Sequence, residues 1–488
     1  MYTFSSKLKT FSLVLMAFGL LGIGYGFYTA PKNIQDVEKL LAVAGHGEAK
    51  HEGSAEAKPS HGDQAKHSEL AEVEEAIGSH EEVAVDAEPS EAKVAKSAKV
   101  AHAEVADKKD IHHVSEESEH TEHLNHVLHQ LQNKPWSALY VACIFFMLVS
   151  LGVLVFYAIQ QVAQAGWSPV LFRVMQGITS YLPVGSVIFF VILVLCGMHL
   201  NHIFIWLDPE VVASDKLIAN KTGFLNFPFW IVRAAIFLTG WSLYQYFSRK
   251  NCLAQDEATD NAFYKKNFNI SAMFLVFFIV SESIMSWDWI MSIDPHWFST
   301  LFGWYVFASF FVSGITTIAL ITLYLKSRGY LEYVNTSHIH DLAKFMFGLS
   351  VFWTYLWFSQ FMLIWYANIP EEVTYFITRI ELYNLPFFGA VVMNFLFPLL
   401  ILINTDFKRI TWVLVMAGIV ILAGHYIDFF NMIMPGTVGD SWFIGVSEIA
   451  SVLFFLGLFI YVVFSALTKS PLLPKRNPFI DESKHFHY

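Results

Sequence analysis

The residues best suited to chemistry lie in the stretch 281–305, SESIMSWDWIMSIDPHWFSTLFGWY. Glu282 falls inside an apolar run, and Asp288, Asp294 and His296 follow where that run ends. An ionisable side chain inside a membrane span is costly, and by default it marks a functional site. Tryptophans, which gather at the boundary between lipid and water, surround these groups. The stretch therefore predicts polar chemistry held at one face of a membrane.

Six further ionisable residues fall near the same ends of other apolar runs. They are His199, His202, Arg233, His425, Asp428 and Glu448. Charged groups in membrane spans face protein or a water-filled cavity and pair with one another. We therefore expect one outward-facing polar pocket capped by the 288–298 loop, in which Arg233 pairs with Glu282. His425 and Asp428 are three residues apart and share a helix face, so they are candidates for a proton relay.

Structural roles compete with these functional ones. Asp294 before Pro295 is a good helix start, with the aspartate as N-cap, and Asp288 is placed where a helix ends in water. His199 and His202 are equally compatible with ordinary interfacial histidines. Glu282 has no comparable structural role, so a functional role is favoured for it.

Composition identifies the class of protein that must position these residues. The chain has 488 residues, of which 55% are hydrophobic and only 15% charged, which is typical of a membrane protein. A span requires about 20 apolar residues, and ten runs are long enough. They are 11–30, 137–162, 173–198, 226–247, 269–291, 299–325, 340–366, 385–404, 410–431 and 443–466. We predict an all-α polytopic membrane protein with ten transmembrane helices.

The basic residues of the short loops predict the orientation of these helices. On one side the loops and tails hold Lys7, Lys9, Arg173, Arg249, Lys250, Lys265, Lys266, Lys326, Arg328, Lys408, Arg409, Lys469, Lys475 and Arg476. On the other side the short loops hold only Lys216, Lys221 and Arg379. Both termini are therefore expected in the cytoplasm, with the 288–298 loop on the opposite, outer side of the membrane.

Residues 31–135 differ from the rest of the chain. They contain no Phe, Trp or Tyr. They hold 22 Asp or Glu, 11 Lys and 12 of the 20 histidines, so their net charge of −11 equals that of the whole chain. Such a segment cannot bury enough apolar surface to fold, which predicts a largely disordered periplasmic segment. The apolar face of residues 124–131 suggests one short interfacial helix at its end. A solvated tether and a histidine-rich metal-binding segment both remain open as its role.

The remaining parts of the chain are assigned from the same patterns. Residues 1–30 are interpreted as an uncleaved anchor, because their apolar stretch is long for a signal peptide and YTA is a poor cleavage site. Residues 136–468 form the main membrane domain, and residues 469–488 a cytoplasmic tail. The three cysteines lie far apart without a C-x-x-C motif, so no metal, haem or iron–sulfur cluster is expected in this chain. No nucleotide-binding loop is found.

A weak internal repeat runs through the membrane domain. One predicted helix ends in HLNHIFIWLDPE (199–210), and another ends in QFMLIWYANIPEE (360–372). Both close with Ile-Trp followed by Pro-Glu, and both run in the same direction. The pattern indicates two parallel four-helix repeats, an arrangement used by many membrane transporters.

Two stretches, SWDWIMSIDPHWFSTLFGWYVFASFFVSGI and FGLSVFWTYLWFSQFMLIWYANIPEE, resemble ActF-type subunits of bacterial alternative complex III, a quinol:cytochrome c oxidoreductase. The resemblance covers about residues 136–470. More broadly, the chain is similar to the NrfD/polysulfide-reductase membrane subunits. The resemblance implies two four-helix bundles without a cofactor of their own, and quinol or menaquinol as a substrate. The implied partners are an iron–sulfur protein, multihaem and monohaem cytochromes c, a sister NrfD-like subunit and a terminal oxidase, with no nucleic acid.

Three functions follow as expectations. In the first, His199, His202, Glu282 and Asp288 act on a quinol headgroup, with Arg233, Asp294 and His296 as further binding residues. Protons then leave through Glu282, His425, Asp428 and Glu448. In the second, the chain is a proton-conducting or scaffolding subunit of the same complex without a quinone site. In the third, it is a divalent-metal transporter with a histidine-rich loop.

Overall fold

The protein is seen in a computed structural model that describes residues 2–39 and 104–487, with side chains from Leu124 onward in the second range. The described regular structure is helical throughout. Ten of the described helical segments are long and apolar enough to cross a membrane, which confirms the predicted polytopic class. They are Ser6–Thr29, Leu124–Val162, Pro169–Gly197, Phe227–Gln255, Ala262–Ile293, Phe302–Ser327, Thr336–Ala367, Asn384–Leu402, Thr411–Ile433 and Val446–Leu467.

The first bundle uses the second to fifth of these segments. Its elements are α3 (Glu104–Val162), η1 (Pro169–Leu171), α4 (Phe172–Thr179), α5 (Leu182–Gly197), α8 (Phe227–Gln255) and α9 (Ala262–Trp289). Helix α8 packs against both α5 and α9. Helix α3 joins them through Tyr140, whose hydroxyl donates to the Trp289 carbonyl at 2.8 Å and whose ring contacts Phe189 of α5.

The second bundle repeats this plan. Its elements are α10 (Phe302–Ser327), α11 (Thr336–Ala367), α13 (Asn384–Val391), η4 (Val392–Leu396), α14 (Phe397–Leu402) and α15 (Thr411–Ile433). Helix α10 packs on α11 and α15, α14 packs on α11, and α13 packs on α15, so the four spans close into a ring. The element η4 is a π-helical turn within the third span.

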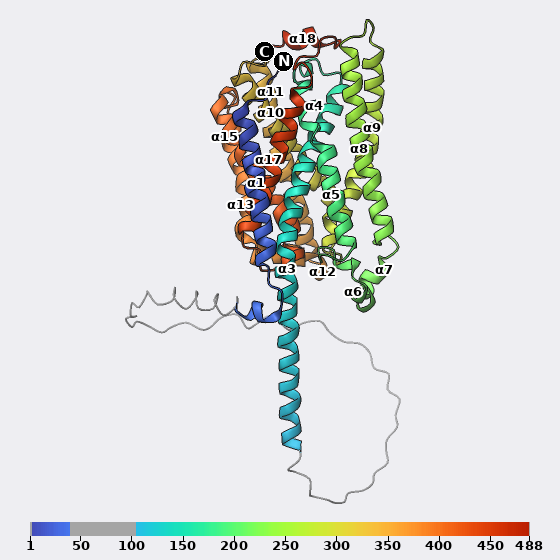
Figure 1. Ribbon diagram of the computed structural model, residues 1–488, viewed down its shortest axis with the longest axis vertical. Coiled ribbons are helices and arrows are strands. Elements are labelled where there is room, and N and C mark those ends of the chain that lie inside the picture. Colours follow the sequence, from blue (N-terminus) through green and yellow to red (C-terminus); the bar gives the residue numbers. More distant parts are fainter. Residues whose placement is uncertain (1, 40–103, 488) are drawn as a thin grey trace, which may run out of the picture. The chain divides into compact units, whose positions relative to one another are not determined.

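Two more spans flank the bundles, and short helices fill the loops. The flanking pair is α1 (Ser6–Thr29) and α17 (Val446–Leu467), which pack against each other. The short elements are η2 (Ile205–Leu207), α6 (Pro209–Ser214), α7 (Lys216–Asn220), η3 (Met291–Ile293), α12 (Pro370–Glu381), η5 (Phe407–Arg409), α16 (Pro435–Val438) and α18 (Ile480–Lys484). Below, the end of the bundles with α6, α7 and α12 is called the α12 face, and the opposite end, with both termini, the terminal face (Figure 1).

The internal repeat has a structural counterpart at the α12 face. The sequence after α5 leads to α6, which begins at Pro209, and the sequence after α11 leads to α12, which begins at Pro370. Proline is favoured in the first helical turn because the missing N–H would have no helical partner there. Both copies of the Pro-Glu signal therefore start a short helix in the loop that follows a span.

The two bundles meet where α3 crosses α10. In the most apolar part of α3, 94% of the residues are buried, and in that of α10, 83%. In the other spans at most 56% are buried. Gly152 and Gly314 permit the close approach: a Cβ on Gly152 would lie 2.6 Å from the Phe310 carbonyl oxygen, and one on Gly314 2.8 Å from the Val153 nitrogen. Small residues at a crossing allow the helix backbones to pack closely in a membrane.

The structure differs from the prediction for the acidic segment. Residues 104–135 belong to α3, which continues into the first bundle without a break, instead of forming a separate short helix near its end. Extending a helix that is already nucleated costs far less than starting a new one, and the span supplies the nucleus. Most of the predicted disordered segment, residues 40–103, lies outside the described residues.

By its internal contacts the chain forms two units. One unit contains Met1–Lys32 and Leu128–Tyr488, and thus both bundles. The other contains Asn33–Val127, in which residues 34–39 and the first part of α3 are described as helical.

Substituting Gly314→Ala tests the crossing of α3 and α10. The added methyl group meets backbone atoms that cannot rotate away, so we expect a loss of roughly 1–3 kcal/mol of unfolding free energy. The measurement is reversible unfolding in detergent micelles, followed by circular dichroism.

Gly348→Ala in α11 is the matched control, because nothing lies within 4 Å of a Cβ at that position. It should leave stability unchanged or raise it slightly through helix propensity. Equal destabilisation by the two substitutions would contradict a close α3–α10 contact.

Candidate functional site

The most developed polar site lies inside the second bundle, around Asp428 of α15. This residue is 2% exposed and accepts hydrogen bonds from neutral groups on two other helices. Ser309 Oγ donates to Asp428 Oδ2 at 2.7 Å, Trp353 Nε1 donates to the same oxygen at 2.9 Å, and the Tyr305 hydroxyl donates to Oδ1. Helices α10 and α11 therefore place three side chains around one buried carboxyl group of α15.

His425, one helical turn before Asp428, completes the cluster. Its Nδ1 lies 2.9 Å from Ser309 Oγ and 3.9 Å from Asp428 Oδ2, while its Nε2 has no hydrogen-bond partner in the described chain. The Trp353 ring packs edge-on against the imidazole at 5.4 Å. The predicted pairing of His425 with Asp428 on one helix face is therefore seen, and Ser309 lies between them. The group of Tyr305, Ser309, Trp353, His425 and Asp428 is called the Asp428 cluster below.

The π-helical turn η4 brings another polar residue to the helix that carries His425. Asn394, which is fully buried, approaches Gly424 so closely that a Cβ there would lie 2.2 Å from Asn394 Oδ1. Neither polar atom of the Asn394 side chain has a partner in the described chain. Single π-helical turns occur frequently at functional sites, and buried amides of this kind are usually satisfied by water.

A small cavity adjoins the cluster on the side of the α12 face. Its lining includes Tyr305, Gln360, Tyr375, Arg379 and Asn431, and its size suits about one water molecule. Arg379 is buried and donates to the carbonyls of Asn431 at 3.0 Å and Tyr375 at 2.8 Å, while its guanidinium lies 3.3 Å from the centre of the Tyr375 ring. Tyr305 thus contacts Asp428 and this cavity at the same time.

The first bundle has its carboxylate at a comparable place, but an arginine neutralises it. Arg233 of α8 donates to Asp288 of α9 through Nε at 2.6 Å and through Nη2 at 2.8 Å, a two-pronged ion pair. Asp288 is fully buried, and its backbone carbonyl accepts hydrogen bonds from Trp230 and Ser292. The expected pairing of Arg233 with Glu282 is therefore wrong; Asp288, about two turns nearer the α12 face, is the partner.

Glu282 has no basic partner. It is 4% exposed, and its carboxylate is hydrogen-bonded only by Ser286 at 3.1 Å and Ser283 at 3.3 Å, both on its own helix. Within the described chain no hydrogen bond or ion pair joins it to Asp288 or to the Asp428 cluster. Its functional role stays a prediction.

The two predicted histidines at the end of α5 do not reach the carboxylates. His199 is exposed and adopts a positive φ of 57° just after α5. The backbone of His202 exchanges hydrogen bonds with the side chain of Asn133, and its ring contacts that of His129 at 5.2 Å. Burial, the larger cause, and the neighbouring His129 lower the pKa of His202. In the described chain neither histidine hydrogen-bonds Glu282 or Asp288, and the headgroup pocket stays a prediction.

The 288–298 loop packs on its neighbours. His296 Nε2 lies 2.5 Å from Asp215 Oδ2, and Lys221 donates to the Pro295 carbonyl at 2.6 Å. The hydrogen bond from His296 is the main cause of the lowered pKa of Asp215. The expected N-cap at Asp294 is wrong, because Asp294 follows η3 and the next helix begins only at Phe302. Through Asp215 and Lys221, the residues that flank α7, the loop contacts both ends of that helix.

Glu448 caps a helix. Its Oε2 accepts from the Gly445 backbone N–H at 2.8 Å, so the side chain closes the first turn of α17. A side chain that caps its own helix has an adequate structural explanation. The structure shows no hydrogen bond from Glu448 to His425 or Asp428 among the described residues.

A second polar network lies in the first bundle towards the terminal face, around Tyr157. Gln161, Gln176, Asn267 and Ser248 all place a polar atom 3.0–3.3 Å from the Tyr157 hydroxyl. The network ties α3, α4, α8 and α9 together, as interhelical hydrogen bonds do in membrane proteins. It is a structural centre that the sequence did not reveal.

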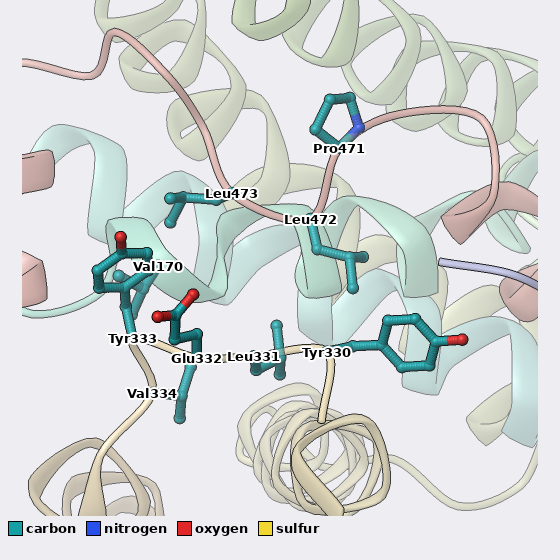
Figure 2. A pocket seen from close by; sticks show the side chains of 9 residues that line it. All are labelled: Val170, Tyr330, Leu331, Glu332, Tyr333, Val334, Pro471, Leu472 and Leu473. Carbon is teal, nitrogen blue, oxygen red and sulfur yellow. The ribbon is translucent and has the colours of Figure 1, made fainter. Parts of the chain in front are cut away.

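The best-formed pocket at the terminal face is unrelated to these groups. It has a volume of about 260 Å³ and lies between the segment 330–334 and the tail residues 471–473. Figure 2 shows Leu472 and Leu473 of the tail across from Leu331 and Glu332. Glu332 is the only charged residue in its lining, and none of the predicted site residues contributes to it.

Sequence reasoning found two members of the Asp428 cluster and missed three. Tyr305 and Ser309 are four residues apart in α10, so they share a face. A tyrosine near a span end and a serine inside a span are common interfacial and packing residues, so neither stood out. Trp353 is separated by 75 residues from the aspartate it binds.

Comparisons with known proteins add no assignment. No protein-family model matches the chain, and no curated protein matches it. Among the described residues, no group of three or more histidine, cysteine or acidic side chains is placed to hold a metal ion. The resemblance to the alternative complex III subunits therefore rests on the two quoted motifs alone.

The Arg233–Asp288 pair predicts a strong effect of removing one partner. Asp288→Asn leaves a buried guanidinium uncompensated, and we expect a loss of about 3–5 kcal/mol in unfolding free energy. The double variant Arg233→Leu, Asp288→Leu should be clearly more stable than the single variant, because no unpaired charge remains. Denaturation in detergent, with yield of folded protein as a second readout, measures both.

A redox role for Asp288 predicts the opposite pattern. Asp288→Asn would then fold normally and lose only its turnover with quinol. That result would show that the ion pair is not the main role of this aspartate.

Proposed function

We propose that this protein is a multi-pass subunit of a bacterial respiratory complex of the alternative complex III type, and that its second bundle conducts protons. The observation that carries the proposal is the Asp428 cluster. A buried carboxyl group surrounded by neutral donors, one turn from a buried imidazole, has no cation that holds it permanently ionised. Such a group can change protonation state, as proton relays in membrane proteins require.

The hydrogen bonds define an order of transfer. A proton that arrives at His425 Nε2 converts the ring to imidazolium, which releases its Nδ1 proton to Ser309. Ser309 in turn passes its hydroxyl proton to Asp428, which becomes neutral. For Asp428 to lose its proton, the Tyr305 hydroxyl turns from Asp428 towards the cavity beside Arg379, accepts the proton from Asp428 on its oxygen and releases its own proton into the cavity. No atom other than a proton moves in these steps.

A different polar group lies at each end of this path. On one side, Tyr305 lines the cavity near the α12 face. On the other side, Asn394 lies against the α15 backbone beside His425. We propose that water connects these groups to the two membrane surfaces. The distribution of basic residues supports a periplasmic α12 face and cytoplasmic termini in a bacterial inner membrane.

The resemblance supplies the setting of this path. It supports an assembly with an iron–sulfur protein, cytochrome c subunits and a sister membrane subunit, in which quinol or menaquinol is oxidised. Oxidation of quinol by this chain itself has less support, since no hydrogen bond in the described chain joins His199 or His202 to Glu282 or Asp288, and Arg233 pairs with the Asp288 carboxylate. We therefore favour the proton-conducting role over a quinol site in this chain.

Asp428→Asn in the intact complex tests the relay. The amide keeps the size of the side chain and accepts hydrogen bonds, but it cannot carry the proton. We expect proton movement coupled to quinol oxidation, measured with a pH-sensitive dye in proteoliposomes, to fall by about 100-fold or more. Tyr305→Phe should lower it as well, because it removes the link to the cavity.

Asp440→Asn is the control, since Asp440 lies in the loop before α17 and, in the described chain, its side chain accepts a hydrogen bond from Ser441 and none from the Asp428 cluster. It should leave proton movement unchanged. Subunit composition and haem spectra confirm that each variant complex is assembled. Normal proton movement in an assembled Asp428→Asn complex would rule the relay out.

A further inference from the structure

A groove runs along the lipid-facing surface between α5 and α8, away from the Asp428 cluster. It has a volume of about 510 Å³. Its lining residues are Pro183, Ser186, Val187, Phe190, Val191, Ala235, Leu238, Thr239, Ser242, Leu243, Gln245 and Tyr246. At a rise of 1.5 Å per residue, the lining extends about 12 Å along α5 and about 17 Å along α8. The groove is therefore about as long as one leaflet of the hydrocarbon core is thick.

The groove contains polar side chains that have no protein partner. Ser186 is 4% exposed, and its hydroxyl makes no hydrogen bond. Gln245 is 7% exposed, and none of the hydrogen bonds in the described chain involves its amide. In hydrocarbon an unsatisfied polar group costs several kcal/mol, so these groups require a partner that offers hydrogen-bonding atoms.

Polarity changes along the groove in a fixed order. The span Pro169–Gly197 runs from the terminal face through α4 into α5, and α8 ends at that face, so Pro183 and Tyr246 mark the end of the groove nearest the terminal face. Beyond that end, Arg249 of α8 donates to Ser180 at 2.5 Å, and the exposed Lys250 follows one turn after Tyr246. From the terminal face inward, the surface thus offers cations, then amide and hydroxyl groups, then apolar side chains.

We propose that this groove binds one phospholipid of the leaflet at the terminal face. The cationic end matches the phosphate, the Ser186 and Gln245 donors match the ester carbonyls, and the apolar part matches one acyl chain. A transmembrane helix of a partner is a poorer fit, since it needs a surface about 30 Å long. An isoprenoid quinone has no charge for the cationic end.

A pair of matched tryptophan substitutions tests this site in the intact complex. Val187 lines the groove and is 65% exposed, while Val276 lies on α9 outside the groove and is 69% exposed. Native mass spectrometry of the detergent-purified complex should show a retained phospholipid in the wild type and in Val276→Trp. Val187→Trp fills the groove and should lose that adduct. Equal retention in both variants would overturn the proposal.

A second variant keeps the shape of the groove and removes its donors. Ser186→Ala combined with Gln245→Leu should lower phospholipid retention by about tenfold. Lipid extraction with mass analysis identifies what is bound, and a density map of the complex shows where. A quinone, a neighbouring subunit's helix or no ordered molecule in the groove would each overturn the assignment.

Discussion

The crossing of α3 and α10 is the constraint on which the rest of the membrane domain depends. At Gly152 and Gly314, backbone atoms of the other helix lie where a side chain on the glycine would be. In a membrane the hydrophobic effect does not drive helices together, so association depends on close packing and on interhelical hydrogen bonds. The crossing makes these two helices the most buried spans and leaves the other helices of each bundle to surround them.

The two bundles have the same helix arrangement, but their buried carboxyl groups have different partners. Each places a buried carboxyl group towards the α12 face, on its last helix. In the first bundle Arg233 compensates Asp288, and the pair is fixed by two short hydrogen bonds. In the second bundle Asp428 is held only by a hydroxyl pair and an indole, with His425 nearby. A carboxylate paired with arginine stays ionised, whereas one held by neutral donors can exchange a proton. The repeat therefore provides one carboxyl group paired with arginine and one held by neutral donors.

Sequence patterns predicted the helical framework well because membrane spans have a strong local signal. Ten apolar runs became ten helical segments, and the Pro-Glu echo became two helix starts at Pro209 and Pro370. The pairing of ionisable groups was harder to predict. Arg233 was matched to Glu282 by depth, yet the rotation of α9 about its axis turns Asp288 towards the arginine. Asp294 looked like an N-cap, but the chain continues through a loop to Phe302 before the helix begins.

By itself, the sequence determined the number and order of the ten apolar helical segments, and that His425 and Asp428 share a helix face. These properties follow from hydrophobicity and helical periodicity, which depend on near neighbours in the chain. Only the tertiary structure decided that Tyr305, Ser309 and Trp353 surround Asp428, that Arg233 neutralises Asp288, and that α5 and α8 leave a groove. These contacts join residues 55 to 123 positions apart or depend on how whole helices pack, and packing is set by side-chain volume and helix rotation, which local patterns do not encode.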